Sequence, residues 1–210
     1  MRFSVLVLFS LIFHSVLWMP VSQASVNPEI VSRVESYLRN LKTAKADFVQ
    51  TAPNGRRLSG TFYLKRPGRL RFEYDGIKDF IVADGTFVYF YDSELESQSH
   101  APIGQSPADF LLREDLSLTD NKDIAIGQAF ETSEEIVITL SRKEDPQAGA
   151  LTLFFKILGD STIMLDEWIV KDARDNLTKV DLENFSADVS FDRNLFVYHD
   201  PKSGEPVYNK

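Results

Sequence analysis

Side chains that commonly carry catalysis or bind metal ions are scarce in this sequence. It holds three histidines and no cysteine, and only His100 and His199 lie beyond residue 24. A histidine-based zinc site or a Ser-His-Asp arrangement would need one of these two. We place His100 in a loop and His199 near the C-terminus. Because Gly-x-Ser-x-Gly, His-Glu-x-x-His and phosphate-loop motifs are also absent, we predict no catalytic residue, no metal and no cofactor.

One charged side chain stands where apolar chemistry is expected. In the stretch LKRPGRLRFEY, which begins at residue 64, strand alternation puts Phe62, Leu64 and Arg66 on one face. Arg66 therefore continues an apolar row. Pro67 restricts the backbone of Arg66 to the extended region, which holds this placement.

The first 24 residues have the pattern of a secretory signal peptide. Arg2 precedes an apolar run, Pro20 breaks it, and Ser22 and Ala24 are small residues at the cleavage-site positions. A membrane anchor is the alternative, because the run is about as long as a short membrane span. We expect cleavage after Ala24 and a periplasmic location.

Composition narrows the class of protein further. The chain has 210 residues and a formal net charge of −8, which disfavours nucleic acid as a partner. Without cysteine it must be stable without disulfides, which suits a bacterial periplasmic protein. The length suits one domain, which we place at residues 25–210.

Periodicity predicts one helix followed by a sheet. Asn27, Pro28 and Glu29 form a helix start, and apolar residues then recur at helical spacing to Leu41. Alternation predicts strands at 44–51, 58–66 and 70–74, and two more around a hairpin turn at Asp84-Gly85.

The second half of the chain repeats the strand pattern after a polar, turn-rich stretch. A short helix from Ser106 as N-cap carries Phe110, Leu111 and Leu112. Strands follow at 124–130, 135–141, 151–157, 163–171 and 177–185, with a possible last strand at 195–198. We predict a mainly antiparallel α+β fold, an incomplete and strongly curved β-barrel with helices forming a lid over its concave apolar face.

The pairing of the second and third strands can be predicted from their apolar rows. Rows match when Leu64 faces Phe72 and Phe62 faces Tyr74. The connection is then residues 67–69, and Arg66 stands opposite Leu70 at the rim of the apolar face. Whether this face packs against a core or lines a cavity for an apolar ligand is left open by periodicity alone.

The order of these motifs resembles a known family. A signal peptide, an amphipathic helix, ADFVQ, GTFYLKRPGRLRFEY and IVADGTFVYFYD, in this order, are similar to the outer-membrane lipoprotein carrier family, LolA. The resemblance is close through Asp92 and looser afterwards, and the tail FVYHDPKSG departs in spacing. It implies an incomplete antiparallel barrel lidded by helices.

The resemblance also implies a function. LolA-type carriers accept acylated lipoproteins from an inner-membrane ABC transporter complex and pass them to an outer-membrane lipoprotein receptor. Arg66 maps onto the family arginine that latches the lid of the empty carrier. We expect a monomer whose cavity binds acyl chains through Phe48, Phe62, Leu64, Leu70, Phe72, Tyr74, Val88, Phe90, Phe110, Leu111 and Leu112. The alternatives are a periplasmic lipid- or lipoprotein-sensing regulator with a related fold, and an enzyme acting on lipid or envelope substrates.

Overall fold

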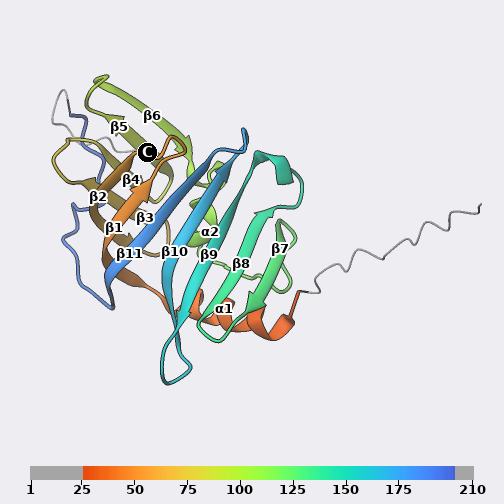
Figure 1. The fold of residues 1–210 in the computed structure, drawn as a ribbon. Helices are drawn as coiled ribbons and strands as arrows, with labels where there is room; N and C mark the ends of the chain where they lie inside the picture. The colour runs from red at the N-terminus through yellow and green to blue at the C-terminus, as the bar shows by residue number, and fades with distance from the viewer. Residues whose placement is uncertain (1–25, 202–210) are drawn as a thin grey trace, which may run out of the picture.

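Eleven strands form one antiparallel sheet in a computed structural model that describes residues 26–201 (Figure 1). The predicted signal peptide and its cleavage site lie outside these residues. The sheet order is β6-β5-β4-β3-β2-β1-β11-β10-β9-β8-β7. The strands are β1 (Thr43–Thr51), β2 (Arg57–Lys65), β3 (Arg69–Tyr74), β4 (Phe80–Asp84), β5 (Phe87–Asp92), β6 (Ser97–Pro102), β7 (Ile124–Glu131), β8 (Glu135–Arg142), β9 (Gly149–Ile157), β10 (Ile163–Asp172) and β11 (Leu177–Ala187).

The sheet stays open, and helices cover one face of it. Strands β6 and β7 are its two edges, and no pairing joins them within residues 26–201. Helix α1 (Pro28–Asn40), η1 (Ile103–Gln105) and α2 (Asp109–Leu112) pack apolar side chains into the same core as the inner residues of the sheet. A further short turn of helix, η2 (Pro146–Ala148), precedes β9. The predicted incomplete barrel is thus confirmed. No helix of the described part is long and apolar enough to cross a membrane.

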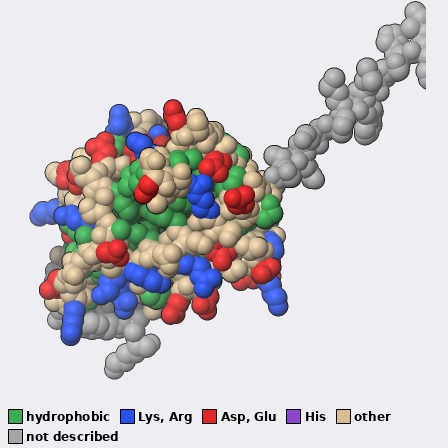
Figure 2. All heavy atoms as spheres, turned by 90° about the horizontal axis from the view of Figure 1, so that it is seen from below, with side chains coloured by type: hydrophobic (Ala, Val, Ile, Leu, Met, Phe, Trp, Pro, Cys, Tyr) green, Lys and Arg blue, Asp and Glu red, His purple; other side chains and the backbone are tan. Residues whose placement is uncertain are grey.

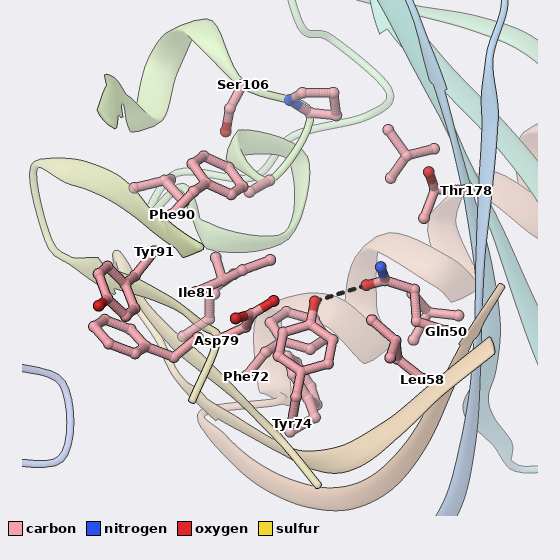
Figure 3. Close-up of a pocket in the computed structure, with 18 of the residues that line it drawn as sticks. Gln50, Leu58, Phe72, Tyr74, Asp79, Ile81, Phe90, Tyr91, Ser106 and Thr178 are labelled. Atoms are coloured by element: carbon pink, nitrogen blue, oxygen red, sulfur yellow. Dashed lines mark hydrogen bonds between the residues drawn. The ribbon is translucent and has the colours of Figure 1, made fainter. Parts of the chain in front are cut away.

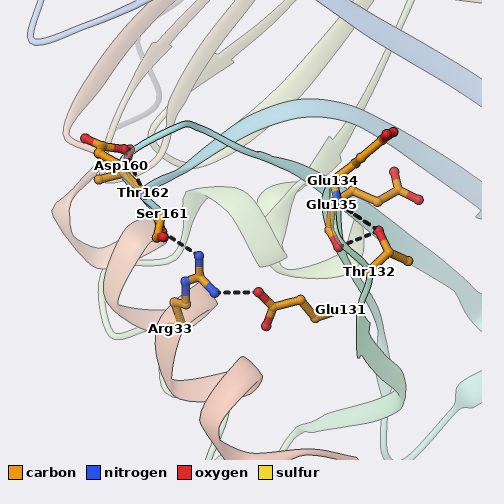
Figure 4. A network of polar contacts seen from close by, with 8 residues as sticks. All are labelled: Arg33, Glu131, Thr132, Glu134, Glu135, Asp160, Ser161 and Thr162. Carbon is orange, nitrogen blue, oxygen red and sulfur yellow. Dashed lines mark hydrogen bonds and ion pairs between the residues drawn. The ribbon is translucent and has the colours of Figure 1, made fainter.

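Helix α1 is fixed to the sheet by both its apolar face and its polar side. The Asn27 side chain accepts a hydrogen bond from the backbone N–H of Glu29, as expected of an N-cap. On the polar side, Arg33 donates to the Glu131 carboxylate at 2.8 Å and to the Ser161 carbonyl at 2.5 Å (Figure 4). The Tyr37 hydroxyl accepts a bond from the Leu165 N–H at 3.0 Å. These contacts connect α1 to β7, to the turn between β9 and β10, and to β10.

The register of β2 and β3 differs from the prediction by two positions. Leu64 faces Leu70 and Phe62 faces Phe72, so the apolar rows match as expected but with other partners. Arg66 does not stand opposite Leu70, because the connection consists of residues 66–68. Gly68 explains the shift, since its φ of 76° supplies the left-handed residue that closes a three-residue hairpin.

Three polar or irregular segments were assigned wrongly from the sequence. His100 lies on strand β6, not in a loop, because the backbone of this mostly exposed edge strand pairs with β5 although its side chains do not alternate. The predicted helix begins at Asp109, and Ser106 instead ends η1. Residues 195–198 form no strand, since Asp192 initiates a turn there through its side chain and its carbonyl.

The C-terminal segment (residues 189–200) packs on the outer face of the sheet. The Tyr198 ring stacks on the Tyr89 ring at 4.3 Å between centroids, and both are buried together with Val82. Phe191 contacts the Tyr63 ring at 5.8 Å. The outer side of the first half is thus aromatic, and residues 189–200 cover part of it.

Candidate functional site

A cavity of about 680 Å³ lies inside the curved sheet, under residues 103–119, which we call the lid segment. Its walls come from β1 to β6, from the lid segment, and from β9 to β11 across the cavity (Figure 3). The cavity is deeper at one end than at the other. The Phe62 side chain is 1% exposed to solvent, whereas that of Phe90 is 41% exposed. The volume is in the range in which proteins hold small ligands. The cavity is therefore deep and apolar at Phe62 and open near Phe90.

One face of the molecule is hollowed and apolar. Figure 2 shows a recessed area of hydrophobic side chains surrounded by lysine, arginine, aspartate and glutamate. A large apolar area with a polar border is typical of a site that binds an apolar partner or ligand.

The predicted site residues divide into a lining and a support. The residues that line the cavity are Phe62, Leu70, Phe72, Tyr74, Val88, Phe90 and Leu111. The buried core, outside the lining, holds Phe48, Leu64, Phe110 and Leu112. Phe48 supports the wall from behind, with its ring 5.0 Å from that of Phe72 and 5.3 Å from that of Tyr74. Both interpretations that periodicity left open, a core and a cavity, thus apply to this face.

The opposite wall was missed because no face was assigned to the strands of the second half. It contains Leu151, Trp168, Val170 and Val180. Trp168 is central, since its ring lies 5.3 Å from that of Phe62 and 6.1 Å from that of Phe72. The alternation of Trp168 with Val170 on the predicted strand 163–171 was the available signal.

One side of the cavity is polar, and we call Gln50, Tyr74, Asp79 and Asp92 the polar rim. The Tyr74 hydroxyl donates to Gln50 Oε1 at 2.9 Å, and the Asp79 carboxylate lies near it (Figure 3). Burial and the neighbouring Asp79 charge raise the pKa of Tyr74 to about 12, although the bond to Gln50 opposes this. Tyr74 is therefore a neutral hydrogen-bond donor at any physiological pH.

Arg66 contacts the C-terminal end of helix α2 in the lid segment. Its Nη2 donates to the Arg113 carbonyl at 2.6 Å, just after α2, and the Gly68 N–H donates to the Leu112 carbonyl at 2.9 Å. These carbonyls are the acceptors that a helix C-terminus leaves free. Arg66 Nε and Nη1 are buried without a partner among the described residues, and burial lowers the Arg66 pKa. The Arg66 guanidinium thus makes one short hydrogen bond to the lid segment, while its other two nitrogens have no hydrogen-bond partner among the described residues.

The lid segment is held at its other points by side chains of α1 and β8. The Glu35 carboxylate accepts bonds from the N–H groups of Leu118 and Thr119, at 2.7 and 3.2 Å. Arg142 donates to the Gly104 carbonyl. Three side chains, including Arg66, thus supply polar anchors of the lid segment. The Gly68 backbone bond and buried core side chains of the segment, such as Leu112 and Leu116, hold it as well.

We expect Glu35→Gln to loosen the lid segment in a pH-dependent way. Burial raises the Glu35 pKa, but the bonds from Leu118 and Thr119 outweigh it, so the pKa is lowered overall from 4.5. A lowered pKa means that the charged form stabilises the fold above about pH 4.5, and that this contribution disappears as pH falls through the folded-state pKa. The variant should lose about 1 kcal/mol of the free energy of unfolding at pH 7.

Urea unfolding at pH 7 and pH 3, together with amide hydrogen exchange at Leu118 and Thr119, checks this. The difference between wild type and variant should shrink at pH 3. Glu114→Gln is the control, since Glu114 is an exposed acid of the same segment. A loss of the same size at both pH values would contradict the role of the Glu35 charge.

Comparison with known proteins gives the family. Residues 39–199 match the sequence profile of the family described as outer membrane lipoprotein carrier protein LolA. The chain belongs to the LolA family. An outer-membrane lipoprotein carrier protein of Methylococcus capsulatus is 30% identical, with 91% of this chain and 92% of that protein covered. Another, from Legionella pneumophila strain Lens, is 30% identical over 83% of this chain and 87% of its own length.

The LolA match spans the candidate site. It includes Arg66, the lid segment and every residue of the cavity lining. Among solved structures, a LolA superfamily protein from Nitrosomonas europaea is similar with a TM-score of 0.42 and 8% identity, over 83% of this chain and 99% of that one.

Proposed function

We propose that this protein is a periplasmic carrier that binds the acyl-glycerol anchor of lipoproteins in the cavity and shuttles them from the inner membrane to the outer membrane. The observation that carries the proposal is the lidded apolar cavity, in a chain of the LolA family. The predicted signal peptide is in accord with export. No catalytic residue, metal or cofactor is required for this role.

The physical need for such a carrier follows from the cost of exposing acyl chains. At about 0.8 kcal/mol per CH₂ group, a chain of about 16 carbons costs roughly 12 kcal/mol to expose to water. Side chains such as Phe62, Trp168 and Val180 replace water around the chains without a specific polar bond. Walls of this type shield a ligand and still allow its release.

Release of the ligand is easier if the empty carrier forms a stabilising contact that the loaded carrier lacks. We propose that Arg66 supplies part of this stabilisation as a latch, because its bond to the Arg113 carbonyl closes the lid segment on the empty cavity. The two unpartnered nitrogens of Arg66 keep the stabilisation small. A weakly latched lid can open again when the next ligand arrives.

A carrier between two membranes needs a partner that supplies its cargo and a partner that accepts it. We infer that a monomer takes its cargo from an inner-membrane ABC transporter complex and delivers it to an outer-membrane lipoprotein receptor. A pull-down from solubilised membranes checks the first partner. Recovery of transporter subunits favours carriage, and recovery of a signalling protein instead would favour the lipid- or lipoprotein-sensing regulator.

The direct test uses the protein of residues 25–210 and an acylated lipoprotein in detergent. After dilution of the detergent, we expect the lipoprotein to stay soluble as a one-to-one complex. The same lipoprotein without its acyl chains is the control, and it should not bind. Equal capture of both forms, or of neither, would refute binding through the acyl anchor.

A further inference from the structure

The charges that line the cavity have one sign. Within the part of the chain that the structure describes, the lining contains two carboxylates, Asp79 and Asp92, and no lysine, arginine or histidine. Both acids belong to the polar rim, at the connections on either side of β4 and β5. A ligand whose chains enter the deep apolar end would place its polar group beside them.

Asp79 is held in place without being neutralised. Its Oδ1 accepts bonds from the Ser93 N–H at 2.8 Å and the Ser93 hydroxyl at 2.6 Å, and Asp92 is the residue just before Ser93. No lysine or arginine forms an ion pair with it among residues 26–201. The nearby Tyr74 hydroxyl donates to Gln50 instead. The Asp79 carboxylate therefore lines the polar side of the cavity, beside the Tyr74 hydroxyl and with no cationic partner among the described residues (Figure 3).

We propose that Asp79 makes the cavity selective against anionic lipids, so that an uncharged acyl-glycerol anchor binds in preference to an acidic phospholipid with the same chains. The inference rests on the proposed function and adds its substrate discrimination. An acyl-glycerol group carries no charge, whereas the phosphate of an acidic phospholipid is negative. Two like charges at a poorly hydrated cavity mouth repel more strongly than they do in bulk water.

This discrimination matters because a carrier that takes its cargo from a membrane also meets the phospholipids of that membrane. Acyl chains alone cannot distinguish the two classes, since the apolar walls contact methylene groups that both ligands share. Only the head group differs, and specificity of this kind is commonly achieved by repelling the wrong ligand. The Asp92 carboxylate accepts turn bonds from the N–H groups of Glu94 and Leu95 and adds to the same field.

A displacement assay tests the proposal. The protein is loaded with the neutral dye N-phenyl-1-naphthylamine, which is displaced by lysophosphatidylcholine or by lysophosphatidylglycerol with the same 16-carbon chain. We expect the wild type to bind the anionic lipid about five times more weakly than the zwitterionic lipid at low salt. Asp79→Asn should reduce this ratio to below about twofold, because the amide keeps the acceptor for Ser93 and loses the charge.

Asp75→Asn is the matched control. It removes the same charge from a nearby exposed residue that does not line the cavity, and it should leave the ratio unchanged. In the wild type, raising the salt from 20 to 500 mM should also reduce the ratio, by screening. This second measurement needs no variant.

Three outcomes are decisive against the idea. Equal binding of both lipids by the wild type, or an equal change of the ratio in the two variants, would overturn the inference and leave the proposed function intact. Binding of neither lipid, together with no complex with acylated lipoprotein, would overturn both.

Discussion

Replacing Arg66 by leucine is expected to slow the release of bound lipoprotein about tenfold while the protein remains folded. The structure shows a bond of 2.6 Å from Arg66 Nη2 to the Arg113 carbonyl, which we propose closes the lid segment on the empty cavity. A hydrogen bond from a charged donor contributes about 1.5–3 kcal/mol, and about 1.4 kcal/mol corresponds to a tenfold change in an equilibrium. Without the latch, the empty closed state loses this stabilisation, so the ligand-bound state becomes relatively more favourable.

The protein should remain folded, because the Gly68 N–H still bonds to the Leu112 carbonyl and the apolar core shared by the sheet and the helices is unchanged. Transfer is measured as the rate at which preloaded lipoprotein leaves the carrier for acceptor vesicles, and affinity is measured by dye displacement. Arg69→Leu is the matched control, since Arg69 is an exposed arginine just past the same turn. If the Arg66 variant transferred its ligand at the wild-type rate, Arg66 would have no part in release.

Replacing Gly60 by alanine should cause the largest loss of stability of any conservative change in the sheet, about 3 kcal/mol. A Cβ atom at this position would lie 1.9 Å from the Glu73 carbonyl oxygen and 2.9 Å from Cε1 of Phe48. The first contact is with backbone of the neighbouring strand β3, which cannot move without breaking its ladder. The Phe48 ring fills the space above the glycine and supports Phe72 and Tyr74 from behind.

Urea unfolding followed by Trp168 fluorescence measures this, because Trp168 is the only tryptophan beyond residue 18. Gly159→Ala serves as control, since a Cβ there meets nothing within 4 Å, and it should cost less than about 0.5 kcal/mol. Dye affinity should fall with stability in the Gly60 variant, because the wall loses its support. A Gly60 variant as stable as wild type would show that β2 and β3 can move apart at this point.

The sequence was most informative where side chains alternate. The inner rows of β2 and β3 could be predicted because Phe62, Leu64, Leu70 and Phe72 alternate with polar residues, and the same pattern led to one wall of the cavity. The register of β2 and β3 could not be predicted in the same way. The apolar rows still match when one strand slides by two residues, and the backbone of Gly68 selects one of these pairings.

Other parts could not be predicted because no periodic pattern records them. Strand β6 is set by backbone pairing with β5, while its side chains, including that of His100, are mostly exposed and do not alternate in polarity. The roles of Asp79 and Glu35 depend on contacts with residues far along the chain or across a turn, such as Leu118. Tyr198 is buried although its segment is irregular, because the aromatic outer face of the sheet receives it.

The strand order has a consequence for how the chain folds. Every neighbouring pair in the sheet is consecutive in sequence except β1 and β11, which join residues 43–51 to residues 177–187. The two halves are therefore meanders of local hairpins, which close small loops at low entropic cost. Only the β1–β11 seam requires the chain to close a long loop, which contains all the other strands. We expect the two meanders to form early and the seam, with the cavity between them, to form last.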